Sequence, residues 1–172
     1  GEVIRDYFLN YHMRNSDISV ELETGNIEVL CQNDAQDWRV TLVDTGLNTM
    51  TGARVKRVEK YIDGDRFMLT YGDGLTDVKI SELVDFHENS GKVGTVTAVS
   101  NPSGFGVMQI EADQVVQFHE KPSVSESLIN GGFFVFQREF LQYLSPKEDC
   151  VLEREPLEQL VQDGELTAYT HR

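Results

Sequence analysis

The sequence predicts an α/β protein with a doubly wound, mixed sheet of the Rossmann-like kind. Apolar runs of strand length alternate with amphipathic helical segments through the middle of the chain. A Gly-Asp-Gly turn follows one of these runs, at the strand end where such sheets bind ligands. The later strands are shorter and closely spaced, which indicates a partly antiparallel portion.

The chain opens with a predicted helix, a hairpin and a strand. Apolar residues recur at helical spacing near the start: Val3, Ile4, Tyr7, Phe8 and Tyr11. Two alternating runs at 18–22 and 27–30 are joined by Thr-Gly-Asn at 24–26, which predicts a β-hairpin. The run at 39–43 predicts a further strand.

The middle of the chain predicts two strand and helix alternations. A loop at 44–51, rich in Thr, Gly and Asn, opens a helix with one apolar side. The nearly continuous apolar run at 66–71 predicts a buried parallel strand that ends at the Gly-Asp-Gly turn. An amphipathic segment from residue 80 predicts a helix that closes at Gly91, and 93–99 predicts the next strand.

The last third predicts short strands, one helix and a final strand. The strands are expected at 106–111, 114–119 and 128–136. A helix at 153–162 is expected to turn three apolar residues inward: Leu157, Leu160 and Val161. It should stop at Gly164, and 166–170 should form the last strand.

Composition limits the size of the fold and the kind of partner. The chain has 172 residues, 40% of them hydrophobic, which predicts a single domain over residues 1–172. Its 29 acidic and 15 basic residues give a formal net charge of −14, the wrong sign for nucleic acid or an anionic membrane. The same charge would repel a nucleoside triphosphate unless local cations or a metal ion offset it.

The two cysteines and the hydropathy of the chain indicate its compartment. Cys31 and Cys150 are too few and too far apart in sequence for a disulfide framework or a paired-cysteine metal site. We expect both to be buried as reduced thiols, which favours a cytoplasmic protein. No apolar run approaches the roughly 20 residues of a membrane-spanning helix, so we expect no membrane partner.

Two strand ends carry residues that suit phosphate chemistry, and each also has a structural explanation. Asp73 lies between two glycines, a position that suits a magnesium ligand at the ligand-binding edge of the sheet. A plain Asp-Gly turn explains the same residues. Lys121 is fixed at a strand end by Pro122, where it could hold a phosphate or only pair with Glu120 at the surface.

Two further segments fit either ligand contacts or ordinary structure. Gly131 and Gly132 interrupt a strand, which marks a bulge or the close approach of a ligand to the backbone. Asn130 beside them can donate to and accept from a sugar hydroxyl. The stretch Thr-Met-Thr-Gly-Ala-Arg at 49–54 could contact a nucleotide, or Thr51 could simply cap a helix.

Taken in order, these segments resemble the sugar-1-phosphate nucleotidyltransferases. The motifs are Thr-x-Thr-Gly-x-Arg at 49–54, Tyr-Gly-Asp-Gly at 71–74, Glu-Lys-Pro at 120–122 and Asn-Gly-Gly-Phe-Phe at 130–134. The resemblance spans nearly the whole chain. Val-Asp-Thr-Gly at 43–46, followed by the 49–54 stretch, is most similar to the branch of glucose-1-phosphate cytidylyltransferases.

The resemblance implies a reaction and a role for each matching residue. It implies transfer of CMP from CTP to glucose 1-phosphate with Mg²⁺ as cofactor, in nucleotide-sugar synthesis for the O-antigen of lipopolysaccharide. The matches to catalytic positions are Asp73, a magnesium ligand, and Lys121, which holds the sugar phosphate. The matches to nucleotide contacts are Thr49, Arg54 and Gly72. The matches to positions around the hexose are Gly106, Glu120, Asn130 and Gly131.

The sequence departs from the family pattern at two positions and at both ends. Ala53 replaces a usual glycine, and Gly104 stands where an arginine is common. The family's Gly-rich opening loop and Lys-Pro motif do not precede Gly1, and its second magnesium-binding aspartate does not follow Arg172. We therefore expect a domain that is incomplete at both ends and poorly active alone. For the complete protein we expect a homo-oligomer.

Three alternatives stay open at the level of the sequence. The same chemistry with UTP or dTTP in place of CTP would use most of the same motifs. A non-catalytic, nucleotidyltransferase-like binding module would keep the sheet but not the triphosphate loop. A carbohydrate-binding protein without nucleotide affinity is a more distant alternative.

Overall fold

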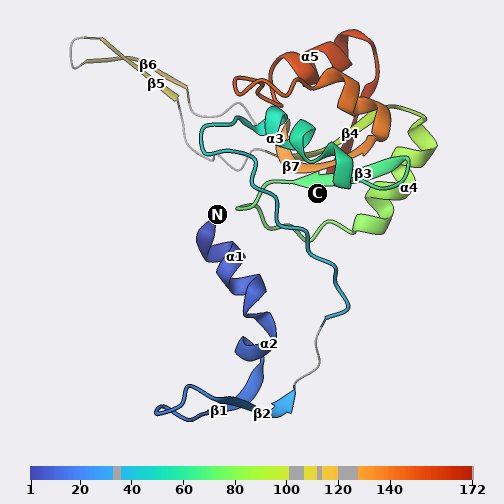
Figure 1. Cartoon of the computed structure of the whole chain (residues 1–172). Coiled ribbons are helices and arrows are strands. Elements are labelled where there is room, and N and C mark those ends of the chain that lie inside the picture. Colours follow the sequence, from blue (N-terminus) through green and yellow to red (C-terminus); the bar gives the residue numbers. More distant parts are fainter. Residues whose placement is uncertain (33–35, 101–106, 112–113, 120–127, 172) are drawn as a thin grey trace. The chain divides into compact units, whose positions relative to one another are not determined.

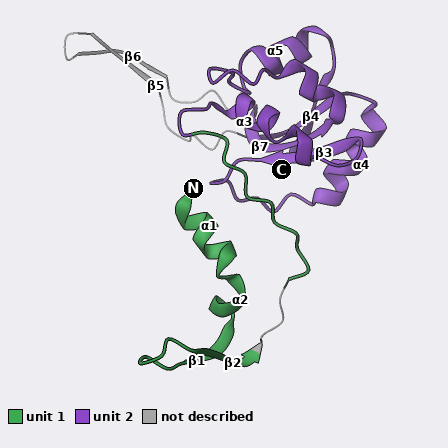
Figure 2. Cartoon of the chain, viewed as in Figure 1, with its two compact units in different colours: residues 1–46 green, residues 47–172 purple. Residues whose placement is uncertain are grey.

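The structure is a computed structural model that describes residues 1–32, 36–100, 107–111, 114–119 and 128–171. The chain divides into two compact units, residues 1–46 and residues 47–172 (Figure 2). The first contains two short helices and a hairpin, and the second contains a four-stranded sheet with its helices (Figure 1). The helices in the described ranges are all too short or too polar to span a bilayer.

The first unit consists of elements formed by residues close together in the sequence. Its elements are α1 (Glu2–Leu9), α2 (Tyr11–Arg14), β1 (Ser16–Val20) and β2 (Ile27–Gln32). The two strands pair antiparallel around a turn with Gly25 at φ 74°, a left-handed conformation that glycine adopts without strain. The predicted first helix and hairpin are therefore confirmed. No side chain described in 1–31 and 36–46 is buried.

Two expectations for this unit are wrong. Residues 39–43 form no strand, because no described strand lies against them and a strand exists only where a neighbour supplies ladder hydrogen bonds. Cys31 is exposed rather than buried, since β2 belongs to a two-stranded hairpin whose described side chains cover no core. Cys150, in the second unit, is partly buried, and both thiols are free.

A mixed sheet forms the centre of the second unit. Its strands are β3 (Arg66–Thr70), β4 (Gly94–Ser100), β7 (Leu128–Gln137) and β8 (Leu166–His171), in the order β3-β7-β4-β8. β7 runs antiparallel to β3 and β4, whereas β4 and β8 are parallel. A separate antiparallel pair consists of β5 (Val107–Glu111) and β6 (Gln114–His119), as expected. The α/β class and the mixed sheet are confirmed.

The strand before the Gly-Asp-Gly turn differs from its prediction. β3 is not a buried parallel strand but an edge strand beside antiparallel β7. Half-buried Phe67 and Leu69 alternate with exposed neighbours along it, which is the period-2 pattern of a strand with one face on the core. Because β3 and β4 are both antiparallel to β7, they still run in the same direction.

Helices cover the sheet of the second unit. They are α3 (Thr51–Arg57), α4 (Ile80–Ser90) and α5 (Glu155–Gln162), with short 3₁₀ segments η1 (Glu59–Tyr61) and η2 (Arg138–Tyr143). All three α-helices were expected, and Gly91 at φ 62° ends α4 as predicted. Val161 is not inward as expected but 60% exposed, because Leu160 takes the core-facing position one residue earlier on α5.

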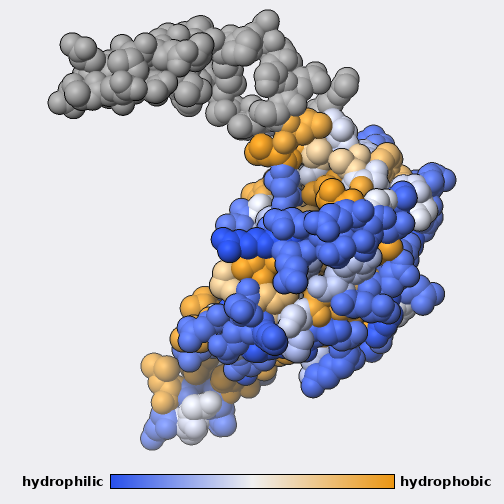
Figure 3. Space-filling model, turned by 90° about the horizontal axis from the view of Figure 1, so that it is seen from above, coloured by the Kyte–Doolittle hydropathy of each residue, from blue (hydrophilic) through white to orange (hydrophobic). Residues whose placement is uncertain are grey.

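Aromatic packing on β7 builds the core of this unit. Phe136 and Phe140 are fully buried, and their rings stack with centroids 3.8 Å apart, next to Leu160 of α5. On the other face of β7, Val135 packs against Leu83 of α4. Neighbouring side chains along β7 therefore pack on opposite faces of the sheet, Phe136 with Leu160 of α5 and Val135 with Leu83 of α4. Figure 1 shows α4 and α5 beside the sheet. On the face seen in Figure 3, separate apolar patches lie among hydrophilic surface.

Candidate active site

The structure describes six of the nine predicted site residues. These six are Thr49, Arg54, Gly72, Asp73, Asn130 and Gly131, and all belong to the second unit. Gly106, Glu120 and Lys121 lie outside the described residues. The expected convergence of Asp73 and Lys121 on one ligand therefore stays a prediction.

The loop before α3 is held by its own side chains. Thr49 is 4% exposed, and its hydroxyl accepts a hydrogen bond of 2.7 Å from Arg57. Arg57 also donates to the carbonyl of Pro146 at 3.1 Å, and Arg54 donates to the carbonyl of Leu47 at 3.1 Å. Thr49 thus supports the loop from inside, while two guanidinium groups supply local positive charge in an acidic chain.

Close packing explains the glycine in the same motif. A Cβ at Gly52 would lie 2.8 Å from the Sγ of Cys150 and 3.1 Å from the backbone nitrogen of Leu152, so a larger residue would force a shift. The N–H of Ala53 donates to the carbonyl of Cys150 at 3.1 Å. The start of α3 is therefore docked tightly on the segment that leads into α5.

The Gly-Asp-Gly turn follows β3 directly. Gly72 and Asp73 are both exposed, and no atom lies within 4 Å of a Cβ placed at Gly72, so a ligand can approach the backbone there. The carboxylate of Asp73 is a hard oxygen donor that fits Mg²⁺, an ion that proteins often hold through one or two carboxylates together with substrate phosphates. Within the described ranges, no group of three or more His, Cys, Asp or Glu could hold a metal ion.

The glycines of β7 form a bulge, and the pairing with β4 shifts register opposite them. A Cβ at Gly131 would lie 3.1 Å from the carbonyl oxygen of Thr97. Gly132 has φ 80°, and its Cβ would lie 2.7 Å from the ring of Tyr71. Close packing at Gly131 and the positive φ of Gly132 therefore disfavour a larger residue at either position, as the bulge interpretation expects, while Asn130 beside them is exposed.

A chain of hydrogen bonds, the Glu153 network, joins these segments through Thr51, Tyr71, Asn130 and Glu153. The hydroxyl of Tyr71 donates to Glu153 Oε1 at 2.6 Å and accepts from Asn130 Nδ2 at 3.1 Å. Thr51 donates to the other oxygen of Glu153 at 3.0 Å. The start of α3 and the residue after β3 therefore both bond to one carboxylate, and the bulge of β7 is linked to it through Tyr71.

Two members of this network were not expected from the sequence. Glu153 was assigned to a helix at 153–162, but α5 begins at Glu155 and leaves Glu153 in the preceding segment. The sequence predicts no role for Tyr71 beyond its place in the Tyr-Gly-Asp-Gly motif. Burial raises the pKa of Tyr71 to about 12, and the hydrogen bond to Glu153 adds to this rise, so the phenol stays protonated at neutral pH.

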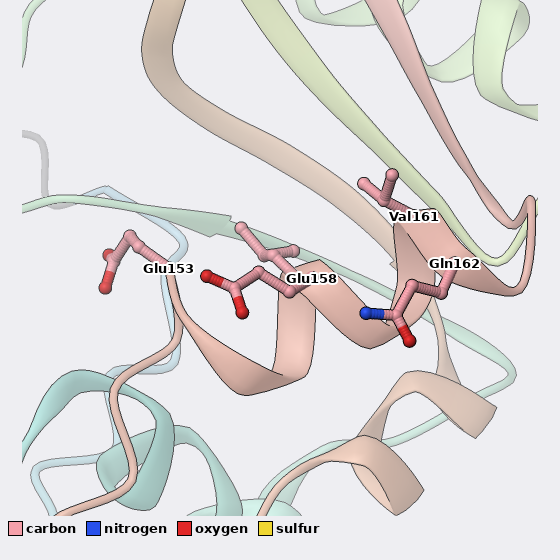
Figure 4. A pocket seen from close by; sticks show the side chains of 5 residues that line it. Glu153, Glu158, Val161 and Gln162 are labelled. Carbon is pink, nitrogen blue, oxygen red and sulfur yellow. The ribbon is translucent and has the colours of Figure 1, made fainter.

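Glu153 also borders a shallow surface hollow along α5 (Figure 4). The residues that line it are Glu153, Leu157, Glu158, Val161 and Gln162. The described residues that line this hollow include two carboxylates and no basic side chain, and such a surface repels phosphate. The lining of the hollow therefore does not fit a nucleotide.

Comparison with known proteins adds sequence likeness to this geometry. The family model described as nucleotidyl transferase matches residues 12–171. The glucose-1-phosphate cytidylyltransferase of Salmonella typhi is 42% identical over 172 residues, which cover 99% of this chain and 66% of that protein. The probable glucose-1-phosphate cytidylyltransferase of Bacillus subtilis is 37% identical over 171 residues, which also cover 99% of this chain and 66% of that protein. The chain spans 66% of the length of these relatives.

Solved structures show the fold at lower sequence identity. A Bacillus anthracis protein in complex with a sucrose superposes with a TM-score of 0.52 at 21% identity, covering 72% of this chain and 53% of that chain. HddC from Yersinia pseudotuberculosis superposes with a TM-score of 0.50 at 19% identity, covering 70% and 53%. These likenesses support the Rossmann-like arrangement of the sheet and helices.

Proposed function

Because this chain belongs to the nucleotidyl transferase family, we propose that the protein transfers CMP from CTP to α-D-glucose 1-phosphate, giving CDP-glucose and pyrophosphate. The observation that carries this proposal is the likeness, along 99% of the chain, to relatives that bear the name glucose-1-phosphate cytidylyltransferase. The meeting of three motif segments at the Glu153 network supports a shared site for them.

The proposed reaction needs no covalent enzyme intermediate. A phosphate oxygen of glucose 1-phosphate attacks the α-phosphorus of CTP in line and forms a new P–O bond. The bond from the α-phosphorus to the oxygen that bridges to the β-phosphate breaks, and pyrophosphate leaves with its electron pair. Since charge in such a transfer spreads over phosphoryl oxygens, the protein contributes mainly positioning and electrostatic stabilisation.

The residues of the proposed site divide into three groups. Asp73 would hold Mg²⁺ after β3, and the bound ion would offset negative charge on the phosphoryl oxygens. Lys121 would hold the sugar phosphate as a point charge. Thr49, Arg54 and Gly72 would form the nucleotide side. The hexose side would consist of Gly106, Glu120, Asn130 and Gly131.

The wider setting belongs to the same proposal. Composition and family resemblance support a cytoplasmic, homo-oligomeric enzyme in nucleotide-sugar synthesis for the O-antigen of lipopolysaccharide. Transfer from UTP or dTTP is the alternative within the same chemistry, because the Gly-Asp and Glu-Lys-Pro motifs do not select the base. A non-catalytic binding module is the alternative outside it.

Replacement of Asp73 in the full-length protein tests the proposal. Asp73→Asn removes the charge that would bind Mg²⁺, so magnesium-dependent pyrophosphate release should fall by roughly a hundredfold or more. Asp63→Asn is the matched control, because Asp63 also precedes a glycine, Gly64 at φ 77°, but at the amino end of β3. Wild-type turnover in Asp73→Asn would contradict the assigned role.

A further inference from the structure

We infer that Tyr71 and Glu153 are positioning residues that fix the amide of Asn130 in the orientation that a sugar hydroxyl of the substrate meets. The inference rests on the proposed function, since it assigns Asn130 to the hexose side of that site. Neither residue is required to touch the substrate. They act by fixing which group donates and which accepts in a chain of hydrogen bonds that runs from the Glu153 carboxylate through Tyr71 to Asn130.

The chemistry of each group sets this direction. An ionised carboxylate only accepts hydrogen bonds, so the Tyr71 hydroxyl must place its single hydrogen toward Glu153, 2.6 Å away. The Tyr71 oxygen is then left as an acceptor and receives the Nδ2 group of Asn130 at 3.1 Å. The Oδ1 of Asn130 in turn accepts from the backbone N–H of Gly132 at 2.8 Å.

The reverse orientation of the amide is strongly disfavoured. If the amide of Asn130 turned by 180°, its oxygen would face a Tyr71 oxygen that has no hydrogen left to give. Its NH₂ group would face the N–H of Gly132, donor against donor. Both internal bonds would be lost together. The Glu153 carboxylate, acting through Tyr71, therefore favours the same one of the two amide orientations as the backbone N–H of Gly132.

Packing holds the relay rigid. The ring of Tyr71 lies edge-on to Phe134 at 5.9 Å between centroids and closely covers Gly132, where an added Cβ would lie 2.7 Å from the ring. Thr51 donates to the second oxygen of Glu153 at 3.0 Å and accepts from the backbone of Leu152 at 3.0 Å. The carboxylate is therefore bonded on both oxygens and cannot rotate freely.

The oriented amide keeps capacity for a ligand. An asparagine amide has two N–H donors and two oxygen lone pairs, and the two internal bonds use one of each. One donor and one acceptor remain on Asn130, which is exposed. A sugar hydroxyl, which both donates and accepts, is complementary to this pair, and a phosphate, which mainly accepts, is less so.

Tyr71→Phe in the full-length protein is the direct test, because it keeps the ring that packs on Gly132 and removes only the hydroxyl. The KM for glucose 1-phosphate should rise roughly three- to tenfold, the change expected for one net hydrogen bond, while kcat and the KM for CTP stay within about twofold. Tyr143→Phe is the matched control, since its hydroxyl also donates to a carboxylate, Asp163 at 2.9 Å, outside the site. Equal effects of the two variants would overturn the inference.

Glu153→Gln gives a graded second test. A glutamine can donate as well as accept, so it no longer forces the Tyr71 hydroxyl to point one way, and the KM for glucose 1-phosphate should rise by less than in Tyr71→Phe. The side-chain amide signals of Asn130 in ¹⁵N NMR supply a readout besides activity. They should move in both variants and not in Tyr143→Phe.

The two readouts separate the inference from the function on which it rests. If the wild type releases no pyrophosphate, the proposed function fails, and the response of the Asn130 amide signals to added glucose 1-phosphate still decides the inference. If the wild type turns over and Tyr71→Phe keeps its KM for glucose 1-phosphate and its Asn130 signals, the proposed function stands and the inference is wrong.

Discussion

The two units of the chain differ in how far their apolar side chains are buried. In residues 47–172, Phe136 and Phe140 are fully buried in a stacked core. In residues 1–46, Val3 is 83% exposed and Leu22 is 92% exposed, and none of the side chains described there is buried. The order of the first unit comes from hydrogen bonds within its short helices and its hairpin.

This difference indicates that the first unit is stabilised mainly by local hydrogen bonds and the second mainly by burial of apolar side chains. Helices shorter than about 12 residues and isolated two-stranded hairpins are marginal in water. Burial of one large apolar side chain contributes about 1.5–3 kcal/mol. Matched substitutions should therefore destabilise the second unit much more than the first, and the following experiments test this contrast.

The largest contrast is expected for Phe136→Ala against Phe8→Ala. Phe136 is fully buried, so its truncation leaves a cavity and should lower the free energy of unfolding by about 3–5 kcal/mol. Phe8 is only half-buried on α1, and its truncation should cost about 1 kcal/mol or less. Urea unfolding followed by circular dichroism measures both. Similar losses would mean that Phe8 is packed as a core residue.

A second contrast compares two glycines with similar positive φ angles. Gly132 at φ 80° and Gly25 at φ 74° both lie in the left-handed region, which costs alanine about 1–2 kcal/mol. Only at Gly132 would the added Cβ also meet another group, the Tyr71 ring at 2.7 Å. Gly132→Ala should therefore lower the thermal midpoint by clearly more than Gly25→Ala. Equal shifts would show that the ring moves aside freely.

A smaller effect is expected from pH at buried His87. Burial lowers the pKa of His87, and the nearby charge of Arg66 lowers it further. The unfolded chain therefore binds a proton at His87 at higher pH than the folded chain. The contribution of neutral His87 to the free energy of unfolding is complete at neutral pH and is lost as the pH falls below about 6.5. The loss should level off below the folded pKa, and each pKa unit of depression corresponds to about 1.4 kcal/mol.

Unfolding at several pH values, with His87→Gln as the control, measures this contribution. The variant keeps a polar side chain opposite Thr95, whose hydroxyl lies 2.8 Å from the His87 ring, but it does not titrate. Its stability should change less between pH 7 and pH 5 than that of the wild type. Parallel pH profiles for the two proteins would contradict the burial argument.

The smallest effect concerns reactivity rather than stability. Cys31 on β2 is exposed, whereas Cys150 is partly buried beside Gly52. Because a thiolate must be accessible to react, a maleimide should label Cys31 at least roughly tenfold faster than Cys150. Single Cys31→Ser and Cys150→Ser variants assign the two phases. Equal labelling rates would mean that the packing at Gly52 opens readily.

Much of the fold follows from local pattern. Hydrophobic periodicity predicted α3, α4 and α5, and glycine predicted the end of α4 at residue 91, because helix formation and termination depend on nearby residues. Which strands pair depends on residues far apart in the sequence. Local pattern therefore did not predict that β3 is an edge strand or that 39–43 lacks a partner among the described strands. The periodicity of α5 also wrongly predicted that Val161 points inward, whereas its neighbour Leu160 is the buried residue.

The candidate site shows the same division. Residue types in order along the chain were enough to single out Asp73 and Asn130. The Glu153 network was not predictable, because it brings together residues 51, 71, 130 and 153 through tertiary structure. The family resemblance implies a nucleotide contact for Thr49, which stays a prediction. The burial of Thr49 and its hydrogen bond to Arg57 could not be predicted, because they depend on the packing of the loop.

The central claim is cytidylyl transfer to glucose 1-phosphate, and a nucleotide panel tests it most directly. Pyrophosphate release by the full-length protein would be measured with CTP, UTP, dTTP and GTP in the presence of glucose 1-phosphate and Mg²⁺. We predict that kcat/KM is at least roughly tenfold higher for CTP than for any other nucleotide. Equal or faster turnover with UTP or dTTP, or no release with any of the four, would contradict the claim.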